Sequence, residues 1–202
     1  MQGRVTVDDV VVDELGARVN PTAQVIRVDG VRIAQAQGKV VFALHKPLGV
    51  VTTMSDPQGR TCVGDLVAHL DQRLFHVGRL DADTSGLLLL TNDGDLAQRL
   101  GHPSFGVAKT YIAKVSGAIE ERRLTVGVCR VLSRGSGESV IELTIHEGRN
   151  RIVRRLLEQL GHPVIELART QVGPVRLAGL PVGSVRALDN RELGELYSQV
   201  GL

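Results

Sequence analysis

Apolar and polar residues alternate along several short stretches of the chain, a period typical of strands that bury one face. Residues 4–12 (RVTVDDVVV) alternate around an Asp-Asp pair, and residues 25–33 repeat the pattern around Asp29-Gly30. Each stretch predicts a β-hairpin, and together they predict a small β-rich domain over residues 1–35. Residues 34–39 (AQAQGK) have the composition of a linker.

A second domain is predicted over residues 36–202. The four leucines at 87–90, bounded by Gly86 and Asn92, predict a strand that is buried on both faces. Residues 133–137 read as a mobile loop. Further strands are predicted at residues 40–44, 109–115, 139–145, 164–168 and 172–177.

The clearest helical pattern covers residues 149–160, where apolar side chains recur at the i, i+3, i+4 and i+7 positions. Gly161 and Pro163 are expected to end this helix. Asp189 with Glu192 predicts a capping box for a final helix over residues 190–200. Shorter helices are predicted at residues 64–70, from a cap at Asn92 or Asp93 through Leu100, and at residues 120–126. This mixture predicts an α+β fold whose central sheet is mostly antiparallel and flanked by helices.

Composition adds two points to this picture. Aromatic residues are only 2% of the 202, so Val, Leu, Ile and Ala must fill the core. Because rings are scarce, an aromatic residue in a functional stretch becomes a stronger candidate for stacking on a base. The net charge of +2 is modest, but positive charge gathers at residues 147–155, which carry four arginines and one glutamate. Residues 1–38 are not basic.

Several classes of protein are disfavoured. Cys62 and Cys129 are far apart in the sequence and predict neither a disulfide framework nor a zinc site. The sequence also lacks metal-binding and phosphate-loop motifs, so we expect no metal and no cofactor. No apolar run approaches the roughly 18 residues of a membrane span, and the N-terminus lacks an apolar signal region. We expect a reduced, soluble, cytoplasmic protein without membrane contact.

The segment that is richest in chemistry is residues 76–94 (HVGRLDADTSGLLLLTNDG), which places Arg79 and Asp81 directly before the leucine strand. A carboxylate at the edge of such a strand is held rigidly and partly desolvated, as a nucleophile or general base requires. The pattern alone leaves two alternatives open. The segment could be a solvated turn, and Asp83 could replace Asp81, because residues two apart in an extended chain point to one side.

The same segment resembles the signature of pseudouridine synthases that act on ribosomal RNA, in the branch that often carries an N-terminal S4-like RNA-binding domain. The resemblance covers about residues 40–190. It implies the pseudouridine synthase catalytic fold and the isomerisation of a uridine in ribosomal RNA, with the large subunit favoured over the small. Further stretches resemble the family in the right order: HKPLGVVTT (45–53), KTYIAKV (109–115), EGRNRIVRRLLEQLGHPV (147–164) and ARTQVGPVRLAGLPVG (168–183).

The resemblance implies three catalytic residues. Asp81 falls on the catalytic aspartate, and Tyr111 falls on an active-site tyrosine whose ring would pack on the uracil. Arg154 falls on the basic partner, which would keep Asp81 ionised and oriented. Two of them have a simpler alternative, since Tyr111 could fill the core and Arg154 could lie on a solvated helix face.

The expected partner is ribosomal RNA, with the target uridine single-stranded or flipped out of its stack, and ribosome assembly intermediates are a further candidate. We expect a monomer. We expect Arg79, Arg149, Arg151 and Arg155 to contact phosphates, and Lys46 and Lys109 either do the same or are simply exposed.

Two departures from the family pattern stand out. Residues 3–33 resemble only the β-rich second half of an S4 domain, so we expect a truncated S4-like unit with a reduced role in RNA binding. Ile152 stands where many relatives carry Gln. Two alternative functions fit the sequence less well: a non-catalytic RNA-binding or ribosome-assembly protein on the same scaffold, and a glycosidase. A glycosidase flanks its bond with carboxylates at least about 5 Å apart, which two aspartates in one short loop fit poorly.

Overall fold

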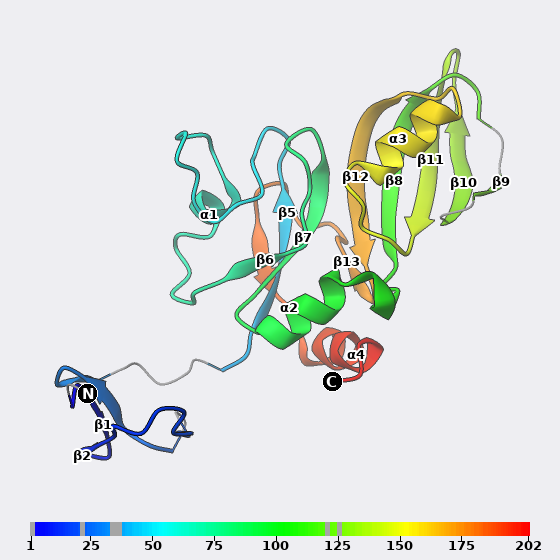
Figure 1. Ribbon diagram of the computed structural model, residues 1–202. Coiled ribbons are helices and arrows are strands. Elements are labelled where there is room, and N and C mark those ends of the chain that lie inside the picture. Colours follow the sequence, from blue (N-terminus) through cyan, green and yellow to red (C-terminus); the bar gives the residue numbers. More distant parts are fainter. Residues whose placement is uncertain (1–2, 21–22, 33–37, 120–121, 125–126) are drawn as a thin grey trace. The chain divides into compact units, whose positions relative to one another are not determined.

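The computed structural model of the protein describes residues 3–20, 23–32, 38–119, 122–124 and 127–202. The chain divides into two compact units, Met1–Lys39 and Val40–Leu202 (Figure 1). The linker expected at residues 34–39 lies mostly outside the described residues.

The N-terminal unit is a small antiparallel sheet made of two hairpins. Asp8 and Asp9 adopt positive φ angles of 49° and 67° in the first turn, and Asp29 and Gly30 do so in the second, which allows two-residue turns. Both predicted hairpins are confirmed. The strands follow the order β2-β1-β3-β4, with β1 (Val5–Val7), β2 (Val10–Val11), β3 (Ile26–Val28) and β4 (Val31–Arg32).

The larger unit contains one sheet in the order β14-β5-β7-β12-β8-β11-β10-β9, with β6 paired to β7 and β13 to β12. The β7–β12 pair is parallel, and the other strand pairs of the described chain are antiparallel, which confirms the predicted fold class. The strands are β5 (Val41–Lys46), β6 (Phe75–Val77), β7 (Ser85–Thr91), β8 (Lys109–Ser116), β9 (Arg122–Leu124), β10 (Gly127–Arg134), β11 (Glu138–Ile145), β12 (Val164–Val172), β13 (Val175–Arg176) and β14 (Val185–Ala187).

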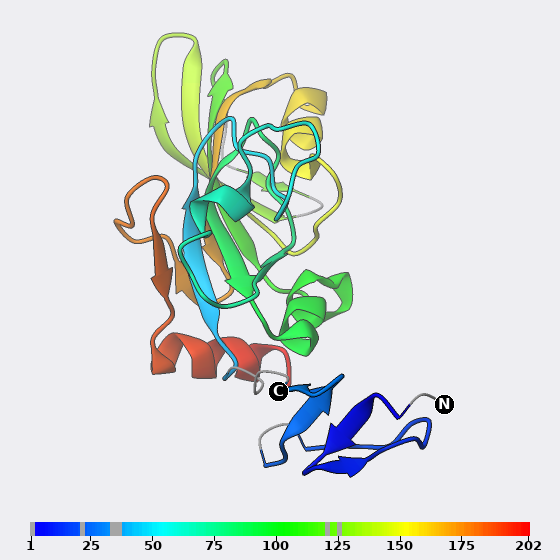
Figure 2. The ribbon, with the colours of Figure 1, turned by 90° about the vertical axis from the view of Figure 1, so that its left-hand side faces the viewer.

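Helices pack on both sides of the central strand β7. Helix α3 lies across β12, β8 and β11, whereas α2 and α4 lie together at the end of the sheet where β5 begins (Figures 1 and 2). Within the described ranges, no helix has both the length and the apolar character needed to cross a membrane. The helices are α1 (Val63–Leu66), α2 (Gly94–Gly101), α3 (Ile152–Gln159) and α4 (Asn190–Gln199), with a 3₁₀ turn, η1, at Pro103–Phe105.

Two helix starts follow from the sequence as expected. The Asp93 carboxylate accepts hydrogen bonds from the backbone N–H groups of Asp95 and Leu96, so Asp93 and not Asn92 caps α2. Asp189 and Glu192 form the predicted capping box of α4.

Strand β7 forms the centre of the core, and its four leucines are fully buried. Leu88 and Leu90 pack in one cluster with residues of α1 and α3, and Leu87 and Leu89 pack in a second cluster with residues of α2 and α4. The prediction of a strand buried on both faces is therefore confirmed.

Other predictions need correction. In the helix expected at residues 120–126, residues 122–124 form β9, because their backbone pairs with β10, and the neighbouring pairs 120–121 and 125–126 lie outside the described residues. Helix α3 begins at Ile152 rather than near Arg149, because Arg151 adopts a left-handed φ of 49°. In the expected loop 133–137, β10 extends to Arg134 and only a tight turn remains. Strand β12 continues to Val172 before the turn into β13.

Candidate active site

An open cleft with a volume of about 330 Å³ lies where the two halves of the large sheet meet. One wall is the segment between β6 and β7, and the opposite wall is the segment that leads into α3. The floor comes from β8 and β12. The side chains that concern the chemistry are Arg79, Asp81, Lys109, Tyr111, Arg149, Arg151, Arg154 and Arg169.

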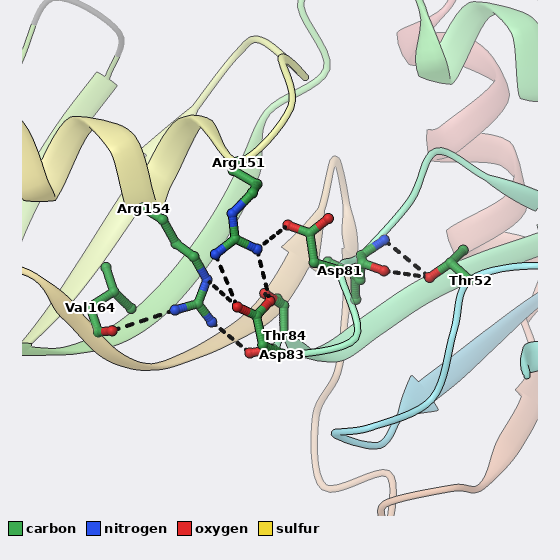
Figure 3. A network of polar contacts seen from close by, with 8 residues as sticks. Thr52, Asp81, Asp83, Thr84, Arg151, Arg154 and Val164 are labelled. Carbon is green, nitrogen blue, oxygen red and sulfur yellow. Dashed lines mark hydrogen bonds and ion pairs between the residues drawn. The ribbon is translucent and has the colours of Figure 1, made fainter. Parts of the chain in front are cut away.

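Asp81 lies in the loop that connects β6 to β7, and hydrogen bonds to the loop's backbone hold it in place. The Thr52 hydroxyl donates to the Leu80 carbonyl at 2.6 Å and accepts from the Leu80 N–H at 3.3 Å (Figure 3). The Gly49 N–H donates to the Ala82 carbonyl at 2.8 Å. The segment at residues 45–53, which resembles a family motif, therefore fixes the backbone on both sides of Asp81.

Two arginines reach this loop from the other wall (Figure 3). Arg151 donates to the Asp83 carboxylate at 3.0 and 3.2 Å and to Asp81 Oδ2 at 3.4 Å. Arg154 Nη2 donates to the Asp83 main-chain carbonyl at 2.5 Å, and Nη1 donates to the Val164 carbonyl at 3.4 Å. Arg154 Nε lies 3.3 Å from Asp83 Oδ2, an ion-pair distance without hydrogen-bond geometry.

The expected pairing of Arg154 with Asp81 is therefore corrected: Arg151 contacts Asp81, and Arg154 contacts Asp83. The cause is the late start of α3, because the left-handed backbone at Arg151 directs its guanidinium to the loop. The side chain of Arg154 lies deeper, with 13% of its surface exposed. The hydrogen bond from Arg151, followed by the charges of both arginines, lowers the pKa of Asp83.

Tyr111 lies on β8 directly opposite Arg169 on β12, and its ring is buried, with 8% of the residue exposed. It also lines the cleft, so the structure brings Asp81, Tyr111 and Arg154 into one cavity. Tyr111 is therefore both a core residue and a cleft residue.

The residues expected to contact RNA fall into different environments. Arg79 and Arg149 are exposed at the cleft, and Arg149 Nε is 2.5 Å from Glu147 Oε2. Arg155 is exposed on α3 and does not line the cleft. Lys109 lies inside, where burial, and then the charge of Arg169, lower its pKa.

Lys46 does not fit the role of a phosphate contact, because its side chain is fully buried. Its ammonium group donates to the carbonyls of Pro47 at 2.9 Å and Val50 at 2.8 Å. Burial lowers the pKa of Lys46 to about 8, and the charges of Asp81 and Asp83 oppose that shift. Lys46 instead fixes the turn that includes Gly49. The Gly49 N–H in turn donates to the Ala82 carbonyl of the Asp81 loop.

Arg169 is a cleft residue that the sequence analysis did not single out. It is 3% exposed, and its Nε donates to the Leu87 carbonyl at 2.8 Å. Its Nη2 is buried without a hydrogen bond in the described structure. The only signal in the sequence was its place in the segment 168–183, which resembles the family's closing strands.

Comparisons with known proteins identify the class to which this fold and cleft belong. Residues 40–159 match the family model described as RNA pseudouridylate synthase. A protein of Mycobacterium tuberculosis named an uncharacterized RNA pseudouridine synthase is 49% identical over 100% of this chain and 86% of its own length. The ribosomal large subunit pseudouridine synthase B of Bacillus subtilis is 41% identical over 96% of this chain and 86% of its own length.

Solved structures agree with the sequence relatives. A crystal structure of a pseudouridylate synthase has a TM-score of 0.66 and 26% sequence identity, and the match covers 96% of this chain and 89% of that one. The chain belongs to the RNA pseudouridine synthase family, and the pseudouridine synthase fold expected from the resemblance is confirmed.

Proposed function

We propose that the protein converts a specific uridine of ribosomal RNA to pseudouridine and that Asp81 is its catalytic carboxylate. The observation that carries this proposal is the position of Asp81, on a hydrogen-bonded loop at the wall of a cleft that also contains Tyr111 and five arginines. The name of the Bacillus subtilis relative supports the large ribosomal subunit as the source of the substrate.

The reaction breaks the bond between C1′ of the ribose and N1 of the base, turns the base, and joins C1′ to C5. Asp81 either attacks C1′ or takes the C2′ proton to give a glycal. In both routes the base leaves with the electron pair of the broken bond. When C5 joins C1′, the Asp81 carboxylate leaves C1′ in the first route and returns its proton to C2′ in the second. The C5 proton is finally replaced by one on N1, so the overall change is an isomerisation that needs no oxidant or reductant.

The other residues of the cleft support these steps. Arg151 donates a hydrogen bond that orients the Asp81 carboxylate, and Arg154 fixes the loop through the Asp83 carbonyl. The ring of Tyr111 packs on the uracil, and its hydroxyl serves a late proton transfer. Since the cleft admits a single nucleotide more readily than a duplex, the uridine enters unstacked or flipped.

The exposed arginines near the cleft bind the phosphates that flank the target uridine. Arg79, Arg149 and Arg155 are placed for this role, which does not depend on sequence. The N-terminal unit is S4-like and contributes less. Two of its arginines are already paired, Arg4 with Asp29 and Arg27 with Asp9, which reduces the charge available to RNA.

The test is a map of pseudouridines in ribosomal RNA from cells with and without this protein. We expect one pseudouridine to be lost on deletion, to return with the wild-type gene, and to stay absent with Asp81→Asn. An unchanged map on deletion would contradict the proposed activity. Full restoration by Asp81→Asn would remove Asp81 from the mechanism while leaving the activity in place.

A further inference from the structure

Arg169 is a buried charge with spare hydrogen-bonding capacity. It is 3% exposed, its Nη2 is buried without a hydrogen bond, and no carboxylate of the described ranges forms an ion pair with it. A charge that is withdrawn from water without a partner lowers stability, and burying an apolar side chain there would cost less. Such a group suits a ligand that places a hydrogen-bond acceptor inside the cleft.

The backbone and one hydrogen bond fix the direction of this guanidinium. Its Nε donates to the Leu87 carbonyl at 2.8 Å, across the parallel pair of β12 and β7. The backbone at Arg169 packs closely on Gly86, where an added Cβ would lie 2.2 Å from the Arg169 carbonyl oxygen. The donor is therefore oriented before any substrate binds, as electrostatic catalysis requires.

The surroundings of Arg169 suit a flat base better than a phosphate. Tyr111 lies directly opposite on β8, and the buried side chains of Leu167 and Val172 line the same cleft. A phosphodiester would lose its hydration in this apolar floor, whereas the exposed arginines at the rim can bind phosphates in contact with water. Lys109 adds a second positive charge nearby.

We infer that Arg169 donates a hydrogen bond to a carbonyl oxygen of the target uracil and stabilises the negative charge that the base acquires when its bond to C1′ breaks. This inference rests on the proposed function. The electron pair of the C1′–N1 bond stays on N1 and spreads onto O2 and O4. The charge disappears when C5 bonds to C1′ and the C5 proton is replaced by one on N1.

This role acts mainly in the transition state, because the oxygens carry more charge in the departing base than in the bound uridine. It also holds for either action of Asp81, since attack at C1′ and removal of the C2′ proton both expel the same base. Loss of Arg169 should therefore slow the chemical step and change RNA affinity little.

The experiment compares the intact protein with Arg169→Gln and Arg169→Lys. RNA affinity and single-turnover pseudouridine formation are measured on a ribosomal RNA fragment that contains the mapped uridine. We expect Arg169→Gln to lower the single-turnover rate by about 10²- to 10³-fold, as for the loss of one preorganised donor to an oxyanion, with affinity within about threefold of wild type. The matched control is Arg130→Gln, at an exposed arginine of β10 outside the cleft, which should change neither quantity.

A wild-type rate for folded Arg169→Gln would overturn the inference, and the wild-type product would show that the proposed function still stands. A loss confined to affinity, with the salt slope lower by about 0.7, would also overturn it and would make Arg169 a phosphate contact. If Arg169→Gln fails to fold, Arg169→Lys is tested with uridine and with 5-fluorouridine at the target, because fluorine makes the base a better leaving group. Relative to wild type, we expect Arg169→Lys to lose less of its rate of C1′–N1 cleavage on the fluorinated substrate than on uridine. Equal losses of rate on the two substrates would contradict a role in charge stabilisation.

Discussion

The two halves of the large sheet differ in what they bring to the cleft. The half formed by β14, β5, β7 and β6 is built around a strand buried on both faces, and its β6–β7 loop carries Asp81 and Asp83. The half formed by β12, β8, β11, β10 and β9 supplies Tyr111, Arg169 and the arginines before and within α3. The first half holds the two aspartates and Arg79, and the second holds the other cleft cations and the ring.

The halves are joined by the parallel pairing of β7 with β12, whose register pairs Ser85 with Ala168 and Gly86 with Arg169. Ion pairs also cross between the halves, from Arg151 and Arg154 to Asp83, but the Asp83 side chain is half exposed, and exposed pairs contribute little stability. The geometry of the site therefore depends more on backbone packing at this junction than on the ion pairs. The following variants test what each half and the junction between them contribute, beginning with the largest expected effect.

Tyr111→Phe tests whether the ring-bearing half contributes chemistry as well as packing. The substitution keeps the buried ring and removes only the hydroxyl. We expect single-turnover product formation to fall by about 10²- to 10⁴-fold, the range for a lost proton-transfer group, with RNA affinity and thermal unfolding unchanged. A wild-type rate would leave Tyr111 with a packing role alone.

Gly86→Ala tests the junction directly. Gly86 has a φ of 107°, and a Cβ there would lie 2.2 Å from the Arg169 carbonyl oxygen. We expect urea unfolding to show a loss of about 3 kcal/mol or more, since a backbone clash adds to the strain of a positive φ. Gly59→Ala is the control: its φ is 70° but a Cβ would meet nothing within 4 Å, so we expect a loss nearer 1 kcal/mol. Equal losses would show that the two halves do not depend on this close approach.

The pH dependence of stability tests whether Lys46 is buried in the half that carries the two aspartates. Its pKa of about 8 in the folded protein lies below the value of about 10.4 in an unfolded chain, because the side chain is buried. Between these values the unfolded chain binds more protons, so the free energy of unfolding should rise with pH, by up to about 3 kcal/mol. Urea unfolding of wild type and Lys46→Met at pH 7.5 to 10.5 isolates the effect. Parallel curves would mean that Lys46 is not held in a desolvated site.

Arg155→Gln gives the smallest expected effect and concerns only the outer surface of the cation-bearing half. Arg155 is exposed on α3, so one phosphate contact is expected to be lost. The log–log salt dependence of RNA binding should become less steep by about 0.7, the value for one phosphate of a single strand. An unchanged slope would remove Arg155 from the RNA-binding surface.

Much of each half could be predicted from local sequence. The four leucines between Gly86 and Asn92 predicted the doubly buried strand, because a run that is apolar at both alternate positions cannot expose either face. The alternation of apolar and polar residues at 109–115 and 139–145 predicted β8 and β11, whose side chains are alternately buried. The capping box at Asp189 and Glu192 located the start of α4, since that interaction is local.

The junction could not be predicted, because it joins residues that are far apart in the chain. Arg169 donates to the carbonyl of Leu87, 82 residues away, and no local pattern indicates this pairing. Lys46 was expected at the surface because lysine is rarely buried, and only the tertiary fold supplies its two carbonyl partners. That Arg151 rather than Arg154 contacts Asp81 depends on where α3 begins, and helix ends are the least certain part of a helix prediction.

The most direct test of the catalytic assignment is single-turnover pseudouridine formation by Asp81→Asn and Asp83→Asn, with RNA binding measured in parallel. The two carboxylates share the contact with Arg151 but differ in their proposed roles. We expect Asp81→Asn to lose at least about 10³-fold in rate, and Asp83→Asn to lose about tenfold through a less ordered loop, with both variants still binding RNA. Product formation at the wild-type rate by Asp81→Asn, with activity abolished by Asp83→Asn, would contradict the assignment.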